Sequence, residues 1–246
     1  RWVYPIIGNS VSDVHNEVKS IRTKSMTSFE ETMNFTLVGE NEVFDVADYC
    51  LSMQFPAGYE FLRYSFDLRA EKVDRTNNTT QLLVFVRFTP QKPLHVISTL
   101  KVRNSLSQEW SFDIDLAVER GKPLATVSIE STLNKQGFTT VTVPMTFRHE
   151  TPFTAYFMPG SATELDVTPK TGVIQPAYVA PVQLPIQVLF MPKMYGKVLK
   201  GSLAVDTPEA QYLFDIIGKT PEYVPPDVSN MSNRINNRLP DEVQRF

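Results

Sequence analysis

Apolar and polar residues alternate along several stretches of this chain. Every second position from Trp110 to Val118 is apolar, with polar residues such as Ser111 and Asp113 between them. Residues 141–147 follow the same alternation. Successive side chains of a β-strand point to opposite faces, so this period of two predicts strands with one buried face and one solvent-exposed face.

Two further segments, residues 29–37 and 81–88, are rich in Phe, Val and Thr, which strands favour. No window of helical length between residues 20 and 222 combines a 3.6-residue apolar period with an absence of proline. The sequence therefore predicts an all-β fold.

The chain also repeats itself. Residues 84–90 resemble residues 186–192, and residues 110–114 resemble residues 212–216, each pair being separated by the same interval. A unit of roughly 100 residues is the size of one β-sandwich domain rather than of a solenoid repeat. Residues 2–8 resemble the last of these segments and form a third, partial copy.

We therefore predict two tandem immunoglobulin-like β-sandwiches within four parts. These are the last strand of a preceding domain (1–8), sandwich 1 (9–121), sandwich 2 (122–222) and a tail (223–246). The link Arg120–Pro123 is short, and a short link fixes the orientation of two domains better than a flexible one does.

The tail is polar and rich in asparagine, which predicts disorder. An alternative is a short docking helix, because Val228, Met231, Ile235 and Leu239 follow a helical spacing.

Composition narrows the class of protein. The chain holds 24 basic and 27 acidic residues, a net charge of −3, which argues against a nucleic-acid binder. Its 10 glycines against 18 prolines disfavour phosphate-binding loops and helical bundles. A single cysteine rules out an internal disulfide, and no apolar run is long enough for membrane insertion. The first residues also lack the pattern of a signal peptide.

Candidate metal ligands and nucleophiles are scattered. Cys50 lies in an apolar stretch without a nearby histidine, which predicts a core cysteine. His15, His95 and His149 are far apart and lack metal-ligand spacing, which predicts surface or loop positions.

Two other patterns mimic functional sites. Asp113 and Asp115 lie two residues apart, as a carboxylate pair would, but the opposite strand face is the apolar one, so both point to solvent. Asp215 recurs at the place of Asp113, which favours a role on the strand face. Residues 196–202 resemble a phosphate-binding loop but have serine where the lysine belongs. We predict no enzyme activity and no catalytic, cofactor-binding or metal-binding residues.

Basic residues cluster weakly in two places, predicted to be solvated strand faces and turns, with docking on an acidic surface as the alternative. The clusters are Lys19, Arg22 and Lys24, and Lys193, Lys197 and Lys200.

The second half of the chain resembles the ASH/major-sperm-protein type of immunoglobulin-like domain. The resemblance rests on the Pro-x-x-Gly turn Pro169–Gly172, on Phe190-Met191-Pro192, on Leu203-Ala204-Val205 and on the aromatic strand 212–218. Residues 9–80 lack the Pro-x-x-Gly turn.

Arrays of such domains occur in cilia- and flagella-associated proteins. The resemblance implies a non-catalytic scaffold of the axoneme, at the central apparatus of a cilium or sperm flagellum, needed for assembly and motility. It places the protein in the cytoplasm and cytoskeleton and implies other axonemal proteins as partners, with microtubules as a further candidate. The alternatives are an adaptor of the major-sperm-protein type that binds peptide motifs, and a secreted adhesion or carbohydrate-binding sandwich.

Overall fold

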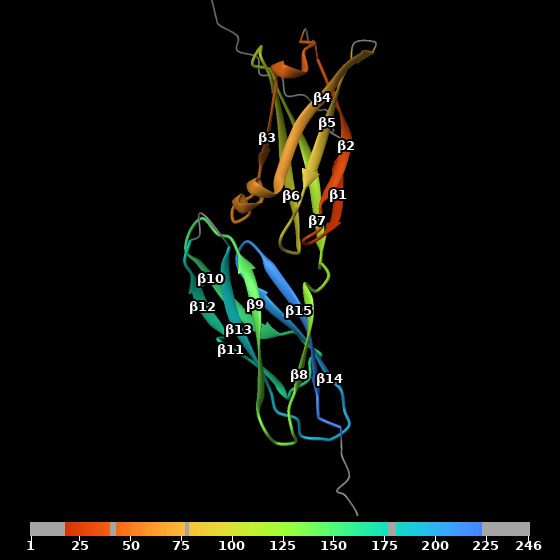
Figure 1. The fold of residues 1–246 in the computed structure, drawn as a ribbon. Helices are drawn as coiled ribbons and strands as arrows, with labels where there is room; N and C mark the ends of the chain where they lie inside the picture. The colour runs from red at the N-terminus through yellow and green to blue at the C-terminus, as the bar shows by residue number, and fades with distance from the viewer. Residues whose placement is uncertain (1–17, 40–42, 77–78, 177–180, 223–246) are drawn as a thin grey trace, which may run out of the picture.

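Figure 1 shows the computed structural model, which describes residues 18–39, 43–76, 79–176 and 181–222. The strands are β1 (Lys19–Lys24), β2 (Phe29–Leu37), β3 (Tyr49–Gln54), β4 (Phe66–Thr76), β5 (Thr79–Phe88), β6 (Leu94–Asn104), β7 (Glu109–Glu119), β8 (Ala125–Glu130), β9 (Gly137–Met145), β10 (Thr151–Phe157), β11 (Leu165–Thr168), β12 (Thr171–Ile174), β13 (Val182–Phe190), β14 (Leu199–Asp206) and β15 (Gln211–Lys219). Two short 3₁₀ helices, η1 (Val46–Asp48) and η2 (Glu60–Ser65), flank β3.

Strands β1 to β7 form the upper sandwich in Figure 1. One sheet has the order β1-β7-β6-β3, and the sheet facing it has the order β2-β5-β4. The inward-facing apolar residues of both sheets form one core, in which Phe35, Leu82, Phe88, Leu100 and Ile114 are fully or almost fully buried. Burying these alternate side chains between two sheets is what holds the layers together.

Strands β8 to β15 form the lower sandwich around a separate core. Its sheets have the orders β12-β10-β14-β15-β8 and β11-β13-β9. In each sandwich the first strand pairs in parallel with the last one, β1 with β7 and β8 with β15, so the sequence repeat is also a repeat of topology. The all-β, two-sandwich prediction is therefore confirmed.

The two sandwiches differ at one edge. In the second sandwich the chain leaves its sheet after Thr168, turns at Pro169 and Lys170, and joins the other sheet as β12, where Gly172 pairs with Phe153 of β10. In the first sandwich β4 instead continues along β5 for its whole length, with one bulge between Ala70 and Lys72. The Pro-x-x-Gly turn that residues 9–80 lack is thus the turn at which the strand changes sheets.

Most predicted strands are present. Residues 29–37 coincide with β2, residues 81–88 lie within β5, and residues 110–118 lie within β7. The alternation at 141–147 reaches past the end of β9, although Phe147 is still buried.

The prediction of a core cysteine is wrong, because Cys50 is exposed on β3. Tyr49, Leu51 and Met53 take the inward positions of that strand, and the period of two turns Cys50 outward. The predicted terminal strand 1–8, the tail and His15 lie outside the described residues.

Candidate interaction surfaces

The aspartates singled out from the sequence lie on the outer faces of the sheets. Thr99 Oγ1 donates a hydrogen bond to Asp113 Oδ1 at 3.1 Å, and Ser202 Oγ donates one to Asp215 Oδ1 at 3.2 Å. Both hydroxyls come from the residue directly opposite on the neighbouring strand. The recurrence of aspartate therefore reflects a cross-strand pair that stabilises each sheet, as the strand-face interpretation predicted.

The described histidines, His95 and His149, each form an isolated pair with one carboxylate. His95 lies 2.8 Å from Asp115, His149 lies 3.0 Å from Glu209, and both imidazoles are largely exposed. A hydrogen bond from Lys101 lowers the pKa of Glu109. Within the described ranges no three His, Cys, Asp or Glu residues are placed to hold a metal ion.

The basic clusters and the segment that mimics a phosphate loop are surface features. Arg22 and Lys24 are exposed on β1, and Lys193 and Lys197 are exposed in the loop between β13 and β14. That loop also exposes Met191, Met194, Tyr195 and Val198. Residues 196–202 run into a strand, as expected, so no helix N-terminus faces a phosphate there.

The two sandwiches meet end to end through the loop between β5 and β6. The backbone N–H of Gln211 donates a hydrogen bond to the Gln91 carbonyl at 2.9 Å. Lys92 Nζ lies 3.0 Å from Asp206 Oδ1 and donates to the Thr207 carbonyl at 2.9 Å. These groups connect the first sandwich to the hairpin between β14 and β15.

The link after β7 adds to this joint. Gly121 N–H donates to Ser25 Oγ at 2.8 Å, and a Cβ added at Gly121 would lie 2.2 Å from the Ser25 carbonyl oxygen. Glycine is therefore required where the link passes so close to the backbone of the first sandwich.

Tyr212, which follows the contact at Gln211, is buried. This burial raises the pKa of its phenol, and the nearby Glu209 adds to the effect.

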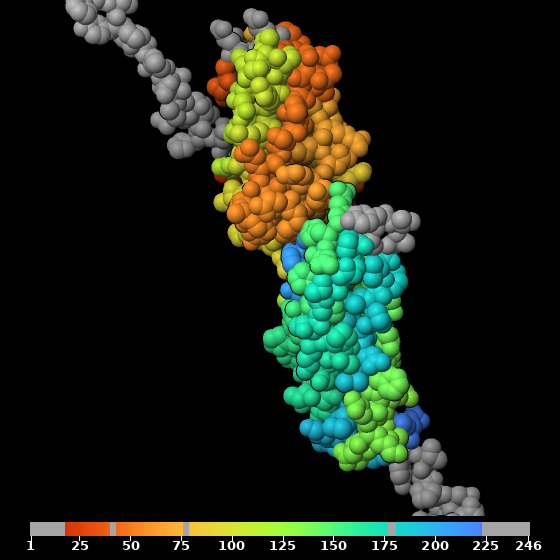
Figure 2. All heavy atoms as spheres, turned by 90° about the vertical axis from the view of Figure 1, so that its left-hand side faces the viewer, coloured from red at the N-terminus to blue at the C-terminus, as the bar shows by residue number. Residues whose placement is uncertain are grey.

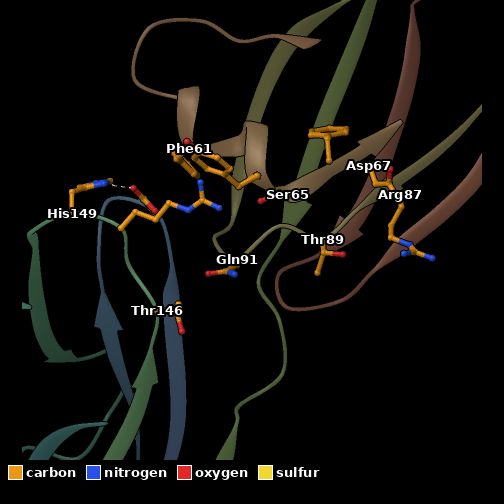
Figure 3. A pocket seen from close by; sticks show the side chains of 12 residues that line it. Phe61, Ser65, Asp67, Arg87, Thr89, Gln91, Thr146 and His149 are labelled. Atoms are coloured by element: carbon orange, nitrogen blue, oxygen red, sulfur yellow. Dashed lines mark ion pairs between the residues drawn. The ribbon is translucent and has the colours of Figure 1, made fainter. Parts of the chain in front are cut away.

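A cavity of about 380 Å³ opens beside the joint (Figure 3). Phe61 and Gln91 line it from the first sandwich, and Thr146 and His149 line it from the second. The charged side chains on its wall are paired, as in the contacts of Arg87 with Glu30, Asp67 with Arg69 and His149 with Glu209.

Across the cavity, the Arg148 guanidinium lies 4.4 Å from the centre of the Tyr64 ring, which adds a further contact between the two sandwiches. The cavity is thus a crevice between two docked ends.

A second hollow, of about 550 Å³, lies on the first sandwich between the edge strands β3 and β4. Its floor is formed by the half-buried side chains of Leu51, Met53, Phe66 and Leu68, which also pack against the core. We call this hollow the β3–β4 groove. It had no signal in the sequence, because its two walls belong to strands that pair with different neighbours.

The joint also escaped prediction from the sequence. Lys92 and Thr207 are separated by 115 positions, and a lysine in a proline-containing loop has no pattern that distinguishes it from a solvated one. The hint in the sequence was the short link Arg120–Pro123, which predicted a fixed orientation of the two domains but none of these contacts.

Known proteins that resemble this chain are associated with cilia and flagella. Residues 9–119 match the family described as CFAP47-like, immunoglobulin-like domain. Over 267 residues the chain is 33% identical to cilia- and flagella-associated protein 47 of Homo sapiens, an alignment that covers 92% of this chain and 8% of that protein. The Mus musculus protein is 33% identical over 141 residues, covering 57% of this chain and 4% of that protein. The chain thus spans less than a tenth of the length of these relatives.

The family match falls on the first sandwich, where the Pro-x-x-Gly turn is missing. Among solved structures, an endo-fucoidan hydrolase of glycoside hydrolase family 107 matches with a TM-score of 0.30 and 7% identity, covering 84% of this chain and 28% of that one. A likeness this weak carries no argument about activity. No helix in the described part of the chain is long and apolar enough to cross a membrane.

Proposed function

Because residues 9–119 match the CFAP47-like immunoglobulin-like domain family, we propose that this chain is a non-catalytic scaffold segment of an axonemal protein. In this proposal it serves a motile cilium or sperm flagellum, at the central apparatus, and contributes to assembly and motility. Its partners are other axonemal proteins, which dock on the faces and open edges of the sandwiches.

The observation that carries the proposal is the docked joint between the two sandwiches. A hydrogen bond between backbones, a lysine–aspartate contact and a tight glycine link connect the two ends. Such a connection holds two domains in one orientation. Force is then transmitted from one sandwich to the next, and the docking surfaces of the two keep fixed relative positions.

The surface chemistry supports docking rather than catalysis. Among the described residues, Asp113, Asp115, His95 and His149 each have a single partner, across neighbouring strands or at the joint. By contrast, the loop between β13 and β14 presents exposed Met194, Tyr195 and Val198 next to Lys193 and Lys197, a mixture of apolar and basic side chains that suits a protein partner.

Localisation of the tagged full-length protein in multiciliated cells tests the proposal. We expect the signal along the axoneme, retained after detergent removes membranes and soluble proteins. A variant of the full-length protein that lacks residues 18–222 is compared with it, and we expect weaker retention on the axoneme. Diffuse or cell-surface signal from the complete protein, with none on the axoneme, would refute the scaffold function.

A further inference from the structure

The outer edge of β3 is open, whereas the same edge of the second sandwich is covered. In the first sandwich β3 ends its sheet, and no described strand pairs with its outer side. Its counterpart β10 is flanked by β12, which runs antiparallel to it. The Ala155 N–H also donates to the Lys170 carbonyl at 2.7 Å on that side. Among the described residues, one sandwich thus contains a strand beside this edge and the other contains none (Figure 1).

The sheet registers identify which residues correspond. Leu51 pairs with Val102 as Ala155 pairs with Val205, so Leu51 corresponds to Ala155. Phe66 and Leu165 both pair with the phenylalanine that ends the middle strand of their sheet, so they correspond as well.

By the same register Leu68 corresponds to Val167, which pairs with Val188 as Leu68 pairs with Val86. The corresponding residues differ in burial. In the second sandwich Ala155, Leu165 and Val167 are buried, whereas Leu51, Phe66 and Leu68 are only half-buried. The β3–β4 groove therefore exposes side chains whose counterparts are covered.

The two walls of the groove differ in how well they would accept another strand. β3 reads Tyr-Cys-Leu-Ser-Met-Gln and contains no charge, no proline and no bulge. β4 carries charged residues along its length and is bulged between Ala70 and Lys72. Charges and bulges are the devices that block pairing at a sheet edge, and β3 lacks them.

From these observations we propose that β3 binds an extended segment of a partner protein as an added antiparallel strand. The backbone of that segment would pair with β3, and its alternate side chains, small and apolar, would fill the β3–β4 groove over Leu51, Met53 and Phe66. The ligand class is therefore an uncharged β-strand peptide with apolar residues at every second position. This names a mode of docking for the scaffold function proposed above and rests on that function for its biological setting.

Figure 2 looks onto this side of the molecule, where the orange surface of β3, η2 and β4 faces the viewer. The exposed thiol of Cys50 lies on the same edge. Arg63 and Asp67 are the charged residues on the groove wall, one of each sign, which favours a partner without net charge over a strongly acidic or basic one.

The test is an NMR titration of the ¹⁵N-labelled full chain with a synthetic peptide of zero net charge, acetyl-Lys-Thr-Val-Thr-Val-Thr-Val-Glu-amide. The control is the same peptide with N-methyl groups on its valines, which keeps the side chains but removes hydrogen-bond donors on one edge. We expect amide shifts concentrated on Tyr49–Gln54 and an affinity at least about tenfold higher for the unmethylated peptide.

A matched pair of variants locates the site. Met53→Ser removes apolar surface from the groove and should weaken binding by about threefold to tenfold. Met191→Ser makes the same change at an exposed position of the second sandwich and should leave binding unchanged.

Three outcomes overturn the proposal. They are an absence of shifts on β3 at millimolar peptide, equal binding of the N-methylated peptide, and equal loss in both variants. Analytical ultracentrifugation of the chain alone tests whether a second copy, rather than a partner peptide, occupies this edge. A dimer whose dissociation shifts the β3 amide signals would assign the edge to a second copy and would also overturn the proposal. Since binding is measured in solution, a failed titration leaves the axonemal localisation standing, and failed localisation leaves a positive titration standing.

Discussion

Replacing Lys92 with methionine removes the charge that joins the two sandwiches while keeping most of the side-chain volume. Lys92 Nζ contacts Asp206 Oδ1 and the Thr207 carbonyl, and the side chains of both members of the ion pair are 28% exposed. Asp206 Oδ1 is itself buried. Among the described residues, Lys92 is the cation that compensates its charge. The substitution therefore leaves a buried carboxylate oxygen without a counter-charge.

The size of the effect follows from this partial burial. Exposed ion pairs contribute about 0.2–1 kcal/mol, whereas removing one partner of a fully buried pair costs about 3–5 kcal/mol. A pair that is roughly three-quarters buried lies between these limits, so we expect Lys92→Met to cost about 2 kcal/mol. Asp206→Asn should cost about 1 kcal/mol, because an uncharged amide tolerates burial better than a carboxylate does. The coupling energy between the two positions should be about 1–2 kcal/mol.

A double-mutant cycle measures this coupling. The free energy of unfolding is obtained by urea denaturation for the wild type, the two single variants and the double variant, together with small-angle X-ray scattering of each. We expect Lys92→Met to broaden the distribution of domain orientations as well as to lower stability.

Lys72→Met is the control, because Lys72 pairs with Asp74 at the surface of the first sandwich and should cost at most a few tenths of a kcal/mol. A coupling below about 0.3 kcal/mol, with unchanged scattering, would refute the idea that this contact holds the joint.

Three further predictions follow from burial and exposure. Phe35→Ala, at a side chain that is 1% exposed, should cost about 3–5 kcal/mol in urea denaturation, while Phe44→Ala, at a side chain that is 60% exposed, should cost under about 1 kcal/mol; similar losses would contradict the assigned core. Cys50 should react fully with Ellman's reagent in the folded chain, and a need for denaturant would show that it is buried. Burial raises the folded-state pKa of Tyr212 above its ordinary value of 10.0, so its contribution to stability is complete below pH 10 and is lost as pH rises through the folded-state pKa. Tyr212→Phe should flatten that alkaline loss, and an unchanged pH profile would count against the assigned burial.

Local patterns predicted much of this fold because every second residue of a strand in a β-sandwich faces the core and is apolar. The alternation at 110–118 became β7, with Phe112, Ile114 and Leu116 in the core. Cys50 shows the limit of that reasoning. Its segment Tyr-Cys-Leu-Ser-Met is apolar enough for either face to be the inner one, and packing against the rest of the core selected Tyr49, Leu51 and Met53.

The functional surfaces depend on contacts between distant residues, and these left little trace in the sequence. The joint brings Lys92 to Asp206 and Thr207, and the β3–β4 groove places Leu51 opposite Leu68 across two different sheets. Neither pair shares a motif or a spacing. The absent Pro-x-x-Gly turn was visible, but its consequence, an uncovered edge on β3, needed the strand order of both sandwiches.

The sequence by itself determined that the chain forms strands, that it repeats, and that it has no spaced set of catalytic or metal-binding residues. These properties are local or periodic, and each follows from residue type and spacing along the chain. The tertiary structure alone decided which edge stays open, which charges meet at the joint and which face of β3 is buried. Those outcomes depend on how two sheets pack and on which strand crosses between them, and such long-range choices are set by the packing of the whole core rather than by any one segment.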